Sequence, residues 1–201
     1  MKIGPKFKIA RRLGAPIFEK TQTAKYTLSL ARKEKTGKRT GRPKSEFGQA
    51  LIEKQKARFT YGLSEKQFRS YVDKALKSAH PTQKLLSLLE TRLDNVLFRS
   101  GLAKTRSAGR QMASHGHATV NGRRVTVPSI HLSTGDTVGL RRSEPLSPLF
   151  ADSTERMKAL AVPAWLEIAP ETREVKVVGE PVLGESQNVF DLGVVIGFYN
   201  R

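Results

Sequence analysis

The sequence predicts an α+β protein with a helical N-terminal region, a small helix–hairpin module and a short C-terminal sheet. Three observations lead to this prediction. Apolar residues recur at spacings of three and four over much of residues 45–114, which is the period of an α-helix. After residue 116 the pattern changes to short β-type segments, the first two joined by Asn121 and Gly122, a dipeptide typical of tight hairpins. Further strand-like segments follow toward residue 199.

Two helices are predicted after a basic first segment. Ser45 caps one that runs to about Phe59. Ser64 and Gln67 have the Ser-x-x-Gln form of a capping box and begin a second helix, which runs to about Ala79 and is stopped by the proline that follows. We expect the aromatic side chains of this region to be buried rather than available for stacking on bases: Tyr61, Phe68 and Tyr71.

A leucine-rich stripe predicts a third helix over residues 83–100, with Gly101 as its C-terminal stop. The stripe is too short for a coiled coil, so we expect it to be core. Thr105 caps a fourth, short helix that runs to Ser114. Gly109 lies inside this helix, which should cost up to about 1 kcal/mol relative to a better helix former.

The predicted strands are short, and one further helix lies among them. Residues 118–120 and 124–127 form the hairpin, and residues 137–140 follow it after a turn. Trp165 is expected to fill core. The remaining predicted elements are a helix over 152–161 and strands over 165–168, 174–178 and 194–199.

The charge distribution indicates the kind of partner. The 201 residues include 36 Lys and Arg against 18 acids, a net charge of +18. Residues 1–60 carry +13, residues 61–142 carry +9, and residues 143–201 carry −4. Such an excess requires a polyanion, and the basic two-thirds of the chain should face it. We interpret residues 1–44 as a basic arm ordered mainly by its partner; a merely solubilising tail would not explain the strong bias toward one sign.

Several classes of function are excluded or disfavoured. No apolar run approaches the roughly 18–20 residues that span a bilayer, no amphipathic basic stripe suits a membrane surface, and the first ten residues lack the apolar region of a secretory signal. Cysteine is absent and the four histidines are scattered, so we expect no metal and no cofactor. No catalytic motif is recognisable, so we expect no enzyme activity.

One stretch carries a specific resemblance. Residues 91–129 read TRLDNVLFRSGLAKTRSAGRQMASHGHATVNGRRVTVPS, which closely resembles the small RNA-binding module named after ribosomal protein four. The flanks IGPKFKIARRLGAP, EKQKARFTYGLSEKQFRSYVDKA and GVVIGFYNR resemble the small-subunit ribosomal protein four family itself. Many bacterial members of that family bind zinc or an iron–sulfur cluster through cysteines near the N-terminus. This chain has none, so no metal is carried over.

The resemblance and the charge together assign the RNA-facing residues. Asp94 is expected to position Arg92 or to cap local structure rather than to touch RNA. Arg106 and Arg110, one helical turn apart, are expected on the surface over phosphates. His115 and His117 are expected to have structural or RNA-contacting roles. The full set of predicted RNA-binding residues is Arg11, Arg12, Arg39, Arg42, Lys44, Lys54, Lys56, Arg58, Arg92, Lys104, Thr105, Arg106, Arg110, His115, His117, Asn121, Arg123 and Arg124.

The predicted organisation has four parts. They are a basic arm (1–44), a helical domain (45–83), the RNA-binding module (84–142) and C-terminal helix and strands packing on both (143–201). The resemblance implies a cytoplasmic ribosomal protein that binds the 5′ part of small-subunit ribosomal RNA, nucleates subunit assembly and contributes to translational accuracy. It implies contacts with ribosomal protein five, with other small-subunit proteins and with messenger RNA near its point of entry, and none with a membrane.

Two alternatives share the same module. One is an RNA-modifying enzyme such as a pseudouridine synthase, for which residues 143–201 are too few to form a catalytic domain. The other is a free-standing factor that acts on stalled ribosomes, which predicts a shorter chain without a long basic arm.

Overall fold

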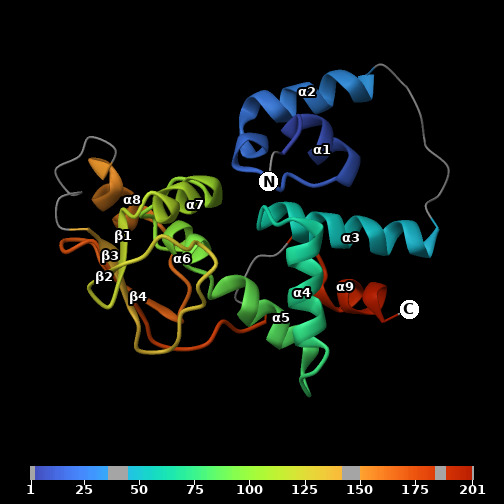
Figure 1. The fold of residues 1–201 in the computed structure, drawn as a ribbon. Helices are drawn as coiled ribbons and strands as arrows, with labels where there is room; N and C mark the ends of the chain where they lie inside the picture. The colour runs from blue at the N-terminus through green and yellow to red at the C-terminus, as the bar shows by residue number, and fades with distance from the viewer. Residues whose placement is uncertain (1–2, 36–44, 142–149, 184–188, 201) are drawn as a thin grey trace. The chain divides into compact units, whose positions relative to one another are not determined.

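The computed structural model describes residues 3–35, 45–141, 150–183 and 189–200, and the chain forms two compact units (Figure 1). Unit 1 comprises Met1–Thr82 with Asn188–Arg201, and unit 2 comprises Gln83–Gln187. Within the described ranges, no helix is both long and apolar enough to cross a membrane. The predicted RNA-binding residues Arg39, Arg42 and Lys44 lie outside the described residues.

Unit 1 begins with three helical elements, which are α1 (Lys6–Leu13), η1 (Glu19–Gln22) and α2 (Ala24–Lys35). This part of residues 1–44 therefore has helical structure of its own, which differs from the predicted arm that is ordered mainly by its partner. The apolar residues scattered between the lysines and arginines are sufficient for a small core, which the basic composition obscured. This cluster consists of Ala10, Leu13, Ala15, Ile17, Phe18 and Tyr26.

The next two helices begin where their caps predict. α3 (Glu46–Thr60) has Ser45 as its N-cap, whose hydroxyl accepts the Gly48 N–H at 3.2 Å. α4 (Glu65–Ala75) begins at Ser64, whose hydroxyl accepts the Gln67 N–H at 3.3 Å. The second helix ends earlier than predicted. The predicted burial of three aromatic side chains is confirmed: Tyr61, Phe68 and Tyr71.

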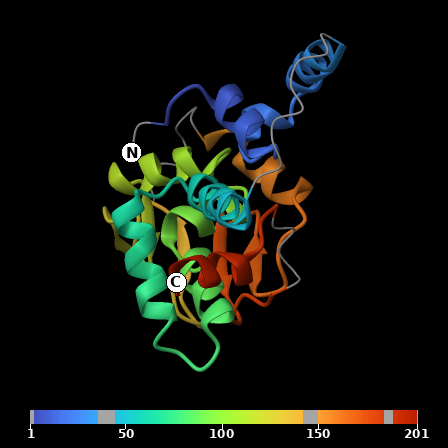
Figure 2. The same cartoon turned by 90° about the vertical axis from the view of Figure 1, so that its right-hand side faces the viewer.

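The last helix, α9 (Leu192–Tyr199), belongs to unit 1 and lies against α3 (Figures 1 and 2). The predicted strand over 194–199 is therefore wrong. A short apolar run does not by itself distinguish a buried strand from a buried helix. Here the deciding group is Asp191, whose carboxylate accepts the N–H groups of Gly193 and Val194 at 2.7 and 3.2 Å and so starts a helix.

Unit 2 is built on a five-stranded antiparallel sheet of order β2-β1-β3-β5-β4. The predicted turn is confirmed: Val120 pairs with Arg123, and the two loop residues Asn121 and Gly122 have φ of 49° and 76°. The second strand of the hairpin is shorter than the predicted 124–127 and begins one residue earlier. The strands are β1 (Ala118–Val120), β2 (Arg123–Arg124), β3 (Thr137–Leu140), β4 (Leu166–Ala169) and β5 (Glu174–Val177).

The predicted single helix over 83–100 is two helices, α5 (Pro81–Glu90) and α6 (Leu93–Arg99). The backbone at Arg92 is extended, because the segment after the hairpin takes the hydrogen bonds that would continue the helix. The N–H groups of Leu93 and Asp94 donate to the carbonyls of Ile130 and Pro128, at 2.8 and 3.1 Å. Such a long-range pairing leaves no local signal in the leucine stripe.

The described part of unit 2 also contains α7 (Arg106–Ser114), capped by Thr105 as predicted, and α8 (Ser153–Ala159). Side chains of α6, α7 and α8 share one apolar core with the sheet. Trp165 is part of this core, as predicted. The core therefore holds α7 and the hairpin in fixed positions on the same unit.

Candidate nucleic-acid interface

Gly109 sets how closely α7 approaches α6. A β-carbon added at this position would lie 2.5 Å from the backbone carbonyl oxygen of Asp94, closer than real contacts allow. The glycine that weakens the helix on propensity grounds is therefore required by packing. It brings the arginines of α7 within reach of polar groups on α6.

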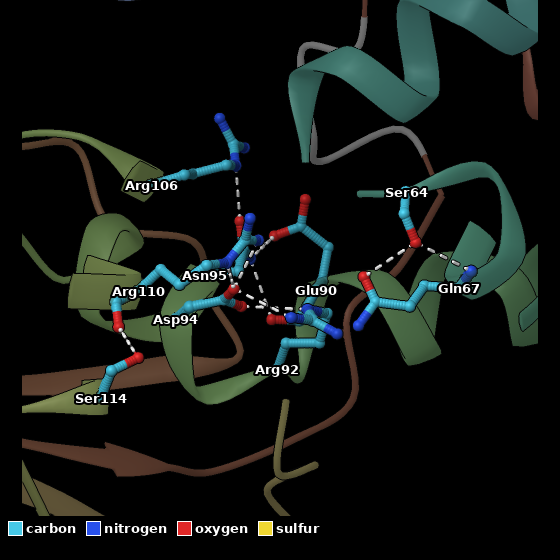
Figure 3. Close-up of polar contacts among 9 residues, drawn as sticks. All are labelled: Ser64, Gln67, Glu90, Arg92, Asp94, Asn95, Arg106, Arg110 and Ser114. Carbon is cyan, nitrogen blue, oxygen red and sulfur yellow. Dashed lines mark hydrogen bonds and ion pairs between the residues drawn. The ribbon is translucent and has the colours of Figure 1, made fainter. Parts of the chain in front are cut away.

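The carboxylate of Asp94 is the centre of the first polar group in this contact (Figure 3). Arg92 donates from Nε to Oδ1 at 3.0 Å and from Nη2 to Oδ2 at 2.9 Å. Arg110 donates to Oδ2 from Nε at 2.9 Å and from Nη2 at 2.7 Å. Of the two structural roles expected for Asp94, these bonds show the positioning of Arg92. Arg92 itself is only 2% exposed, so its predicted direct contact with RNA is not supported.

The carboxylate of Glu90 is the centre of a second polar group. It accepts two hydrogen bonds from Arg99, at 2.9 and 2.8 Å, and one from the amide nitrogen of Asn95 at 2.7 Å. The amide oxygen of Asn95 in turn accepts the Nε–H of Arg106 at 2.7 Å. The Arg106 guanidinium also lies over the Phe98 ring, 4.5 Å from its centroid.

Further basic side chains are exposed on the hairpin and just before α7. Arg123 and Arg124 are exposed on β2, and Arg124 donates to the His115 carbonyl at 3.4 Å. Lys104 is exposed just before α7 and is paired with Asp152 at 3.1 Å. Because α7 and the hairpin rest on the same core, these cations are presented on a fixed scaffold suited to a polyanion.

Comparison with known proteins shows which family the sequence matches. Residues 1–90 match the family described as the ribosomal protein S4/S9 N-terminal domain, and residues 91–138 match the S4 domain. A small ribosomal subunit protein uS4 from Persephonella marina is 40% identical over 202 residues, covering 98% of each chain. The chain belongs to the uS4 family.

Other relatives agree. A small ribosomal subunit protein uS4 from Methylobacillus flagellatus is 38% identical over 197 residues, covering 98% of this chain and 96% of its own. Another, from Corynebacterium kroppenstedtii, is 42% identical over 158 residues, covering 78% of this chain and 79% of its own. A structural ribosomal protein family, rather than an enzyme family, thus accounts for the chain, as expected from its lack of catalytic motifs.

Several predicted site residues of the RNA-binding module lie in other surroundings than expected. Arg106 and Arg110 are partly buried and hydrogen-bonded, so the expectation that they are simply surface charges is wrong. Asn121 is exposed, but its side chain bonds Asp136 at 2.8 Å and the Thr137 N–H at 2.9 Å, which gives it a turn-forming role. Thr105 similarly caps α7, accepting the Ala108 N–H at 3.0 Å.

The two histidines after α7 lie side by side. The ring centroids of His115 and His117 are 5.9 Å apart, and His117 also packs against Phe150 with centroids 5.7 Å apart. Among the described residues, no group of three or more His, Cys, Asp or Glu side chains could hold a metal ion.

Among the described residues of unit 1, the predicted RNA-binding residues on α1 differ from those on α3 in whether they are paired with another side chain. Arg12 is exposed at the end of α1, and Arg11 is half-buried with its Nε donating to the Phe7 carbonyl at 3.1 Å. On α3 the cations are paired with other side chains: Lys56 lies 2.7 Å from Glu53, and Arg58 donates to Gln55 at 3.0 Å.

Lys54 is the clearest departure in unit 1, because it is only 7% exposed. Its ammonium donates to Glu65 at 2.7 Å and lies over the rings of Phe198 and Tyr199, so it holds α9 rather than RNA. Burial alone would raise the pKa of Glu65, but hydrogen bonds from Lys54 and Tyr199 and nearby positive charge outweigh it and lower that pKa. Burial, the hydrogen bond to Glu65 and its charge raise the pKa of Tyr199.

Sequence reasoning missed Glu90, Asn95 and Arg99. A usable signal was present, because Glu90 lies inside the leucine stripe, and acids are almost never fully buried unless paired. Its partners come from the next helix, which the predicted single helix could not have brought into contact with it.

Proposed function

We propose that this chain is a structural constituent of the small ribosomal subunit and that it binds small-subunit ribosomal RNA. The observation that carries the proposal is the group of cations on α7 and the hairpin, fixed by one core, in a chain of net charge +18. The relatives' name, small ribosomal subunit protein uS4, supports the same role.

Binding rests on phosphate contacts and shape more than on reading bases. An A-form RNA helix has a deep, narrow major groove that side chains cannot read, so its phosphates and 2′-hydroxyls are the accessible groups. Arg123 and Arg124 are exposed on β2, and Arg110 is partly exposed with its guanidinium fixed on Asp94. Arginine suits this role because its planar fork matches phosphate geometry.

We further propose the finer role that the family resemblance implies. The protein binds the 5′ part of the ribosomal RNA, nucleates subunit assembly and contributes to translational accuracy within the cytoplasmic ribosome. Its neighbours are ribosomal protein five, other small-subunit proteins and messenger RNA near its point of entry. The basic surfaces of both units fit an RNA partner that is contacted at more than one place.

Binding can be tested with RNA fragments. The full chain is titrated against the 5′ part of small-subunit RNA and, as a control, against an equally long 3′ part of the same RNA. We expect the 5′ fragment to bind at least tenfold more tightly at 150–200 mM salt, where non-specific binding is weak. Equal affinity for both fragments would contradict the 5′ assignment, and the absence of binding would contradict the function itself.

A cellular test separates a constituent from a visiting factor. Small subunits are sedimented through a high-salt wash and probed for the chain. A constituent stays in stoichiometric amounts, whereas a factor acting on stalled ribosomes is removed or is found on only a small fraction of subunits.

A further inference from the structure

Glu90 is an unexpected residue in a chain that binds a polyanion. Its carboxylate is 1% exposed, close to the arginines of the module. Burying a carboxylate carries a large desolvation penalty, and replacing a buried ion pair by apolar residues is often neutral or stabilising. Beside RNA the charge also repels phosphate. Stability alone therefore gives a weak reason for this acid.

The contacts lead from Glu90 to Asn95. The Asn95 amide nitrogen donates to the Glu90 carboxylate at 2.7 Å and to the Glu90 backbone carbonyl at 2.9 Å. An amide has its donors on one side and its acceptor on the other. Because two acceptors of Glu90 hold the nitrogen, the Asn95 oxygen must face the opposite way, toward Arg106.

The Asn95 oxygen, oriented in this way, accepts a hydrogen bond from Arg106. The Arg106 Nε donates to this oxygen at 2.7 Å, and the guanidinium face lies on the Phe98 ring, 4.5 Å from the centroid. A bond at Nε and a stack on the face together fix the plane of the guanidinium. In Figure 3 the outer nitrogens of Arg106 point away from Asn95 and Glu90.

We propose that Glu90 is a positioning residue for RNA binding, which acts through Asn95 to hold the Arg106 guanidinium in the plane that meets a phosphate. Bidentate phosphate recognition depends on that plane. Holding the side chain beforehand also removes the entropy that a mobile arginine loses on binding. Arg99 balances the charge of Glu90, with bonds of 2.8 and 2.9 Å. The inference rests on the proposed RNA binding.

The central test is Glu90→Gln in the full chain, with Glu167→Gln as the matched control. Glu167 is exposed on β4, and both changes remove one negative charge. If charge alone matters, both variants bind RNA more tightly than the wild type. If Glu90 positions Arg106, its variant binds more weakly by about fivefold, the size expected when one side chain must be ordered on binding.

Equal or tighter binding by the Glu90→Gln variant would overturn the proposal. Failure of the wild type to bind RNA at all would instead overturn the proposed function, so the two failures are distinguishable. Circular dichroism at the assay temperature shows whether each variant is folded, since a purely structural role would change affinity only through an unfolded fraction.

A double-mutant cycle identifies the path. In the Arg106→Ala background, Glu90→Gln should cause no further loss of affinity, because the group that Glu90 positions is absent. Losses that simply multiply would show that Glu90 does not act through Arg106.

A second variant keeps the proposal testable if Glu90→Gln does not fold. Arg106→Lys keeps the positive charge but lacks the Nε–H held by Asn95 and the planar fork. It should bind about fivefold more weakly than the wild type, as is expected for Glu90→Gln, because the charge remains but its orientation is lost. Binding as tight as the wild type would show that only the charge is needed and would overturn the proposal.

Discussion

At Gly109 the backbones of α6 and α7 are so close that a methyl group would meet the Asp94 carbonyl oxygen at 2.5 Å. We therefore predict that Gly109→Ala destabilises unit 2 by roughly 1–3 kcal/mol, the usual range for overpacking, despite alanine's better helix propensity. Urea unfolding of the full chain measures the change.

Gly197 provides the matched control, because it lies within α9 and a β-carbon there would meet nothing within 4 Å. Gly197→Ala should stabilise its helix by up to about 1 kcal/mol. The same sign of change at both glycines would contradict the packing explanation for Gly109.

Replacing the arginines of the module with alanine should have two different outcomes. Some replacements should lower both stability and RNA binding, and others should lower RNA binding alone. Arg110→Ala takes a partner from the buried Asp94 carboxylate, and we predict a loss of about 1–3 kcal/mol in unfolding free energy as well as weaker RNA binding. The change of Arg123 and Arg124 to alanine together should weaken RNA binding by roughly 1–3 kcal/mol, with unfolding altered by less than about 0.5 kcal/mol.

Thermal melting and RNA titration on the same preparations test this division. If Arg110→Ala leaves the melting temperature unchanged, its bonds to Asp94 contribute nothing to stability. A sharp loss of stability in the double variant would show that the hairpin arginines are structural.

Side-chain chemistry was partly predictable from the sequence. The Asp94–Arg92 pairing follows from two residues close in the chain, and the Asn121–Gly122 turn follows from which residues tolerate positive φ. The burial of Lys54 and the pairing of Glu90 with Arg99 depend on helices brought together by the fold. Composition gives no information on such pairings.

At the scale of elements, the stability of unit 1 should depend on pH. The reason is that Glu65 accepts hydrogen bonds from Lys54 on α3 and from Tyr199 on α9. The pKa of Glu65 is lower in the folded chain than its ordinary value of 4.5, so protonation favours unfolding. The contribution is fully present above pH 4.5 and is lost as the pH falls below it. We predict that Glu65→Gln makes the stability of unit 1 less dependent on pH between 5 and 3.

Urea unfolding at several pH values, followed by the tyrosine signal, measures this dependence. Tyr199→Phe removes the hydrogen bond from the tyrosine hydroxyl to Glu65 but leaves the bond from Lys54, and should give an intermediate result. If the unfolding free energies of the wild type and Glu65→Gln fall equally as the pH is lowered, other carboxylates control acid unfolding.

Helix starts were predictable and long-range interruptions were not. Ser45, Ser64 and Thr105 cap helices within three residues of themselves, so the sequence contains the whole interaction. The break before α6 depends on carbonyls at Pro128 and Ile130, more than thirty residues away. The strand predicted over 194–199 is a helix for a local reason. Asp191 caps it, and the run of apolar residues that follows favoured a strand.

For the whole molecule, we predict that RNA binding depends strongly on salt. Each phosphate neutralised contributes somewhat less than one unit to the log–log slope, so several contacts give a slope of several units. The charges of +13 in residues 1–60 and +9 in residues 61–142 motivate this expectation. A nearly flat titration in rising potassium chloride would contradict the electrostatic account.

A second whole-molecule prediction concerns fragments. The recognised module ends near residue 142, but β3 pairs with β5, and Met157 and Trp165 are part of the core. We therefore expect residues 83–187 to fold and residues 84–142 to remain unfolded. The longer fragment should bind the 5′ RNA at least tenfold more weakly than the full chain and with a shallower salt slope, because two linked surfaces raise each other's effective concentration.

Circular dichroism of both fragments and titration on one RNA in one buffer series test this prediction. Folding of residues 84–142 would show that the later strands are dispensable. Equal affinity and slope for the longer fragment and the full chain would show that unit 1 adds no RNA contact.

The place of α9 in unit 1 has a consequence for how the chain is made. Synthesis proceeds from the N-terminus, so residues 83–187 leave the translating ribosome before Leu192–Tyr199 do. The helices and strands described for unit 2 have all been made at that moment, whereas α3 still lacks α9, the helix that packs against it. The half that is translated first is thus expected to finish folding last.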